Sequence, residues 1–124
     1  ETDKIVSKKI FKKLSPKEGA PDGMTLDKNK NLWVAHFHGA CISVFNNKAK
    51  LIHRIRFPAK NITNCAFGGK DTNELYVSTA TKGMNKADLQ KFRYSGFFFS
   101  VKTNVKGILQ KKFILNNEEK RSLL

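Results

Sequence analysis

The sequence is poor in acidic residues and in cysteine, and it contains no long hydrophobic run. Only 10 residues are Asp or Glu, against 24 Lys and Arg, and only two are Cys. A stretch of roughly 18 to 20 apolar residues, as needed for a membrane-spanning helix, is absent. The opening residues 1–4 also lack the layout of a signal peptide. These absences predict a soluble, cytoplasmic protein with no membrane partner.

The two cysteines, Cys41 and Cys65, each lie within a short apolar stretch. Neither has a second cysteine nearby, so a structural zinc site of the CxxC type is not predicted. Without a secretory signal there is no reason to expect a disulfide. We therefore expect two free, buried thiols.

The surplus of basic residues gives a formal net charge of +14 and raises the hypothesis of a nucleic-acid-binding module. Phosphate and base recognition favours the bidentate guanidinium group, but 20 of the 24 basic residues are Lys. The lysines are scattered along the chain and accompanied by 11 Asn, which indicates a compositional bias. We therefore favour a solvated lysine surface over a polyanion partner.

Strand patterns dominate the rest of the sequence, and 40% hydrophobic residues with ten Phe predict a folded protein. Short runs rich in β-branched and aromatic residues alternate with polar hairpin turns. The first four runs predict one antiparallel meander of the size of a propeller blade. They are residues 24–26, 32–37, 41–45 and 51–57.

A second unit repeats the first, since Trp33 and Tyr76 are 43 residues apart, within the period of roughly 40 to 50 residues that propellers show. The sequence thus predicts an all-β, partial propeller. Its expected parts are outer strands of a preceding blade in 1–20, a blade in 21–58, a last blade in 59–115 and a tail in 116–124. The last blade contains a polar insertion at 79–95 that could hold one helical turn, and its final strand is expected at 107–115.

One carboxylate, Asp22, lies within the turn-forming tripeptide Pro21–Gly23. Proline fixes its own φ and glycine permits unusual backbone conformations, so this segment predicts a stiff corner ahead of the next strand. A structural turn aspartate is the alternative reading. The equivalent place in the second unit holds Thr63 and Asn64, which are predicted to line the channel mouth. His36 is predicted at the surface or rim, with channel lining as the other possibility.

The order and spacing of several short motifs resemble the C-terminal part of the regucalcin (senescence marker protein) and gluconolactonase family, which includes the insect luciferin-regenerating enzyme. The motifs are residues 21–24, 32–35, 65–69, 75–78, 96–98 and 105–107. The resemblance implies a six-bladed propeller, of which this chain supplies about two blades and part of a third. The missing N-terminal half, or association with other chains, would complete the ring.

What the resemblance implies for function is a metal-dependent sugar-lactone hydrolase, in which water attacks a lactone carbonyl polarised by one divalent cation (Ca, Zn, Mn or Mg). Asp22 matches the family's metal ligand and general base. Glu18 is a second nearby carboxylate. The family's other ligands, a glutamate and an asparagine, lie outside this sequence, so we expect the isolated chain to be inactive. A non-catalytic propeller that serves as a binding module is the alternative.

Overall fold

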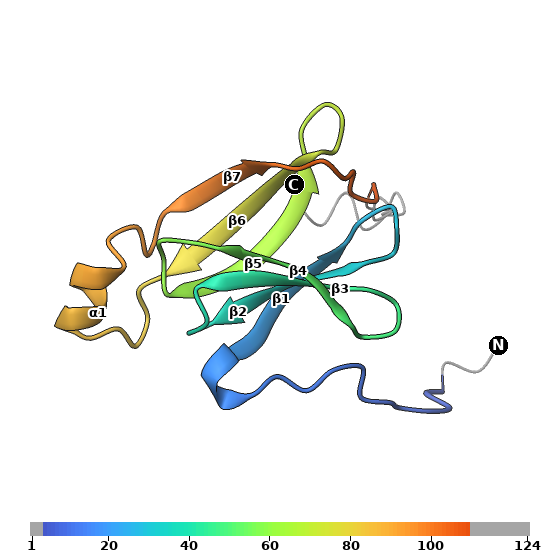
Figure 1. Ribbon diagram of the computed structural model, residues 1–124, viewed down its shortest axis with the longest axis horizontal. Coiled ribbons are helices and arrows are strands. Elements are labelled where there is room, and N and C mark those ends of the chain that lie inside the picture. The colour runs from blue at the N-terminus through green and yellow to red at the C-terminus, as the bar shows by residue number, and fades with distance from the viewer. Residues whose placement is uncertain (1–3, 110–124) are drawn as a thin grey trace, which may run out of the picture.

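The computed structural model describes residues 4–109, which form two antiparallel sheets (Figure 1). Their neighbouring strands follow the sequence order, as predicted for a meander in each unit. The first sheet consists of β1 (Ala20–Leu26), β2 (Leu32–Phe37), β3 (Cys41–Phe45) and β4 (Leu51–Arg56), and the second of β5 (Asn61–Gly68), β6 (Glu74–Ala80) and β7 (Phe98–Lys102). These elements confirm the predicted all-β class.

The polar insertion between β6 and β7 contains α1 (Lys86–Lys91). Asn85 caps this helix, because its side-chain oxygen accepts a hydrogen bond from the Asp88 N–H at 2.9 Å. The predicted helical turn in the insertion is therefore confirmed. No helix in the described part of the chain is long and apolar enough to cross a membrane.

The hydrophobic core lies between the two sheets, which face each other in Figure 1. Trp33 of β2 packs edge-on against Phe67 of β5, with 5.1 Å between ring centroids. The thiol of Cys65 donates to the Trp33 carbonyl at 3.7 Å. The remaining buried members come from both sheets and from the β4–β5 connection, and they are Ala35, Ile42, Val44, Phe57, Ala59, Ile62, Leu75 and Val77.

A buried carboxylate organises the turn between β1 and β2. Asp27 is 1% exposed and accepts hydrogen bonds from the Asn31 backbone N–H at 2.9 Å, the Asn31 amide at 3.0 Å and the Trp33 indole N–H at 3.0 Å. Asp27 also forms an isolated bridge with Gly107, which joins the far end of the chain to this turn. The carboxylate thereby fixes the aromatic ring that spans the two sheets.

The N-terminal segment differs from its prediction, because residues 4–15 form no strand. Ile5 and Val6 are 88% and 95% exposed. A strand is stabilised by hydrogen bonds to a neighbouring strand, and the inner strands expected beside this segment are not in the sequence. The final strand predicted at 107–115 and the tail at 116–124 lie outside the described residues from 110 onward.

We expect Asp27→Ala to lower the free energy of unfolding by about 3 kcal/mol, since it leaves the Trp33 indole and the Asn31 N–H without their acceptor. Urea unfolding followed by tryptophan fluorescence would measure this loss. Asp71→Ala, at an exposed turn, is the matched control and should change stability by less than about 0.5 kcal/mol. Equal stability of the two variants would contradict a structural role for Asp27.

Candidate functional site

The residues singled out from the sequence gather at one end of the two sheets. Because neighbouring strands are antiparallel, the starts of β1, β5 and β7 lie at the same end as the ends of β2 and β6. In Figure 1 this is the end that carries α1. The first residues of β1 and β5 and the β6–β7 insertion therefore share one rim.

Asp22 lies on a β-bulge inside β1, which corrects the prediction of a turn ahead of the strand. Pairing between β1 and β2 is regular at Pro21 and again from Met24 onward. Between these positions Asp22 and Gly23 together oppose the single residue Ala35. A bulge tolerates a proline, whose missing N–H would weaken a regular ladder. Pro and Gly mark turns and bulges alike, so the sequence could not separate the two.

The Asp22 carboxylate is exposed, and no residue among 4–109 donates a hydrogen bond to it. Most other described carboxylates accept hydrogen bonds from protein donors, namely Glu18, Asp27, Glu74 and Asp88. Asp71, which like Asp22 accepts none within this part of the chain, lies in the β5–β6 turn at the opposite end. Asp22 is thus the carboxylate at the rim whose oxygens remain available.

Thr63 is the unpaired residue of a similar irregularity in β5, where the register shifts between Ile62 and Asn64, and Asn64 pairs with Ser78. The Thr63 and Ser78 hydroxyl oxygens are 2.8 Å apart. Asn64 is exposed, and its side-chain oxygen accepts a hydrogen bond from the Cys65 N–H at 2.8 Å. Asn64 lies against Gly23, the residue after Asp22, so the structure brings this part of β5 close to Asp22, while channel lining by Thr63 and Asn64 stays a prediction.

His36 lies near the end of β2, at the rim, but its side chain is completely buried, so the prediction of a surface position is wrong for this residue. Channel lining by His36 stays a prediction. Its Nδ1 lies 2.7 Å from the Glu18 carbonyl oxygen. Since a carbonyl only accepts, Nδ1 carries the proton, and the buried Nε2 has no hydrogen-bond partner within the described residues. The residues preceding β1 fold over His36, a long-range contact that no local sequence pattern indicates.

The Glu18 carboxylate forms an ion pair with Arg54, which argues against a role of Glu18 as a metal ligand. Its carboxylate accepts from the backbone N–H and the hydroxyl of Ser15, both at 3.0 Å, and from the Arg54 guanidinium at 2.6 Å. The Ser15 N–H, then the Arg54 hydrogen bond and the Ser15 hydroxyl lower the pKa of Glu18 from its ordinary 4.5 to about 2. The carboxylate is therefore charged and occupied.

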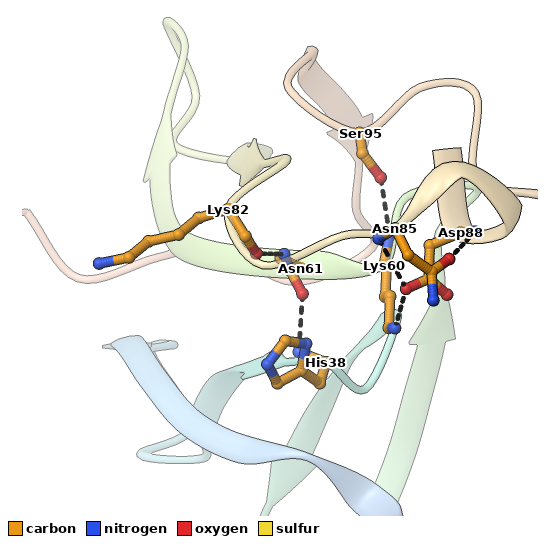
Figure 2. A network of polar contacts seen from close by, with 7 residues as sticks. All are labelled: His38, Lys60, Asn61, Lys82, Asn85, Asp88 and Ser95. Carbon is orange, nitrogen blue, oxygen red and sulfur yellow. Dashed lines mark hydrogen bonds and ion pairs between the residues drawn. The ribbon is translucent and has the colours of Figure 1, made fainter. Parts of the chain in front are cut away.

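A buried amide that the sequence analysis missed joins two loops at the rim (Figure 2). Asn61 is fully buried, and its side-chain oxygen accepts from the His38 backbone N–H at 3.2 Å. Its amide nitrogen donates to the Lys82 carbonyl at 2.9 Å. Asn61 thus connects the β2–β3 loop to the β6–β7 insertion.

Lys60 holds the other side of the insertion, as Figure 2 also shows. Its ammonium group contacts the Asp88 carboxylate at 2.5 Å, and its backbone N–H donates to the Ser95 hydroxyl at 3.0 Å. The hydrogen bond from Lys60 lowers the pKa of Asp88, so this carboxylate is also engaged. The insertion is therefore fixed at the rim by polar contacts on both sides.

Both cysteines are buried, free thiols, as predicted. Burial raises the pKa of Cys41, and it raises the pKa of Cys65 to about 12. A thiol must ionise to act as a nucleophile or metal ligand, so both thiols are unreactive near neutral pH.

Within residues 4–109, no three His, Cys, Asp or Glu side chains gather closely enough to hold a metal ion. The rim therefore offers one available carboxylate, Asp22. Such a group can supply one oxygen ligand to a hard cation and can accept a proton from water. Further ligands for a complete cation site would have to come from outside this part of the chain.

Comparison with known proteins links this arrangement to one family. The family described as SMP-30/Gluconolactonase/LRE-like region matches residues 1–81. Regucalcin of Danio rerio is 36% identical over 110 residues, which cover 87% of this chain and 37% of that protein. A Bacillus subtilis (strain 168) protein named as a candidate sugar lactone lactonase is 41% identical over 91 residues, covering 73% of this chain and 31% of that protein.

The fold also matches a solved structure, described as the calcium-binding protein regucalcin from Agrobacterium tumefaciens str. C58. The TM-score is 0.74 at 24% identity, over 79% of this chain and 33% of that chain. This likeness confirms that the two sheets are blades of a β-propeller, as predicted. The chain spans about a third of the length of the relatives that it matches.

The hydrogen bond from the Ser15 N–H and the contact with Arg54 predict that Glu18 makes a pH-dependent contribution to stability. Since folding lowers the pKa from 4.5 to about 2, the Glu18 contribution is fully present above pH 4.5 and is lost as the pH falls toward 2. Glu18→Gln should therefore be less stable than the unmodified protein at pH 6, and the difference should shrink as the pH falls below 4.5. Urea unfolding across this range measures it, with Asp71→Asn as control. A difference independent of pH would contradict the assignment.

Proposed function

The chain belongs to the SMP-30/gluconolactonase/LRE-like family, and on this premise we propose that the whole protein hydrolyses sugar lactones, with Asp22 as metal ligand and general base. The family's name and the lactonase name of the Bacillus subtilis relative support a lactone as the substrate. Because the chain spans about a third of its relatives, the remaining ligands and substrate contacts come from other parts of the protein.

The observation that carries the proposal is the availability of the Asp22 carboxylate. It stands on the bulge of β1, exposed at the rim and without a donor among the described residues. A buried carboxylate that serves the fold is paired, as Asp27 is, whereas the exposed carboxylate of Asp22 is open to a ligand. Oxygen ligands of this kind suit hard cations such as calcium, and calcium is the first metal to test because a structural relative is described as calcium-binding.

The proposed reaction requires two properties of Asp22. A divalent cation at this rim would polarise the lactone carbonyl and lower the pKa of a nearby water. Asp22 would hold that cation with one carboxylate oxygen and accept the proton of the attacking water with the other. The new carbon–oxygen bond forms as the ring ester bond breaks, and the proton passes to the departing ring oxygen. The product is a hydroxy acid, and no redox cofactor is needed.

We expect Asp22→Asn in the whole protein to lower kcat for gluconolactone hydrolysis by roughly 100-fold or more, the usual contribution of a general base. Initial rates with added Ca²⁺, Zn²⁺, Mn²⁺ or Mg²⁺ give the measurement. Asp71→Asn, the other carboxylate without a described donor, is the control and should keep full activity. The melting temperature of Asp22→Asn should stay close to that of the unmodified protein.

Unchanged turnover of Asp22→Asn would refute the assignment of this residue. A whole protein that shows no metal-dependent turnover with any of these cations would instead favour a propeller that binds ligands without catalysis. The 124-residue chain alone should show little turnover, since it supplies only one of the expected ligands. Activity of the isolated chain comparable to that of the whole protein would contradict this expectation.

A further inference from the structure

We propose that Asn64 is a positioning residue for Asp22, which it orients from the neighbouring strand β5 through the backbone of Gly23. This inference rests on the proposed role of Asp22 as a metal ligand. It assigns to the second sheet a supporting part in the site, in addition to the channel lining predicted for Asn64.

The strands β1 and β5 each carry one irregularity in their first half. In β1 regular pairing resumes at Met24, which pairs with Val34, and in β5 it resumes at Asn64, which pairs with Ser78. The two strands contact each other, and Gly23 of the β1 bulge lies against Asn64, the residue at which pairing resumes in β5.

The contact between the bulges is made by Gly23 and Asn64. A methyl group added at Gly23 would lie 2.1 Å from the Asn64 Oδ1, 2.4 Å from its Cγ and 2.7 Å from its Cα. Real Cβ atoms do not approach heavy atoms this closely. The glycine therefore allows the Asn64 side chain to occupy the space where a side chain of β1 would otherwise stand.

One hydrogen bond fixes the side chain of Asn64, which is otherwise exposed. Its Oδ1 accepts this bond from the N–H of Cys65 at 2.8 Å, and Cys65 is buried in the core between the sheets at 3% exposure. The amide group is thus tied to a part of β5 that packs in the core. It forms a stop against the backbone of Gly23.

Asp22 depends on this stop because its own side chain has no hydrogen-bond donor among the described residues. The direction of its carboxylate is then set by the backbone of the bulge. Residues that orient a metal ligand commonly alter metal affinity by 10- to 100-fold when they are changed, about the effect expected here. Truncation of Asn64 frees the bulge, and the carboxylate loses its fixed direction.

The test compares Asn64→Ala, Asn64→Ser and Asp22→Asn in the whole protein, with Ca²⁺ alone as the probe in titration calorimetry and gluconolactone for kcat and KM. Asn64→Ala should bind Ca²⁺ roughly 10-fold more weakly, the lower end of that range, at a melting temperature that keeps the protein folded. Asn64→Ser should recover part of this loss, since a hydroxyl can also accept the Cys65 N–H. We expect kcat to fall more than KM rises.

Asn46→Ala is the matched control. Its side-chain oxygen also accepts backbone N–H groups, from Lys48 and Lys50, both at 3.0 Å, but in the β3–β4 turn at the opposite end. It should leave Ca²⁺ affinity unchanged. If Asp22→Asn loses Ca²⁺ affinity while Asn64→Ala matches the unmodified protein, the positioning role is overturned and the proposed function stands. If Asp22→Asn keeps its Ca²⁺ affinity, Asp22 is not a metal ligand. Both the proposed role of Asp22 and the positioning role of Asn64, which rests on it, are then contradicted.

Discussion

Trp33 contacts both sheets and fixes their position relative to each other. Its indole N–H is held by the buried carboxylate of Asp27, its ring packs on Phe67 of the second sheet, and its carbonyl accepts the thiol of Cys65. A rotation of this ring would disturb the β1–β2 turn, the core and the inner strand of the second sheet together. The relative placement of β1 and β5, and with it the rim, depends on this anchor.

Local patterning was sufficient to predict β2 and β3, because each is a short apolar run bounded by polar turns. The runs 32–37 and 41–45 became β2 and β3 without change. Whether a segment finds a neighbouring strand to pair with could not be predicted in the same way. Residues 4–15 have the composition of a strand, but a strand also needs a neighbour, which a local pattern does not report.

The rim was predicted less well than the strands, since its features depend on register and on long-range contacts. The bulge at Asp22 appears only when β1 is aligned with β2. His36 was misplaced because the backbone that covers it belongs to Glu18, far away in sequence. Asn61 was overlooked for a similar reason, as its two partners lie in loops that approach each other only in the folded chain.

The tripeptide Pro21–Gly23 combines two requirements that respond to different selection. The Asp22 carboxylate has no hydrogen-bond donor among the described residues, whereas Gly23 is required because Asn64 of β5 occupies the space that a side chain of β1 would need. A propeller with another residue at position 22 would still need the glycine to pack β1 against β5. The glycine therefore reports how the two sheets pack, and residue 22 can vary without disturbing that packing.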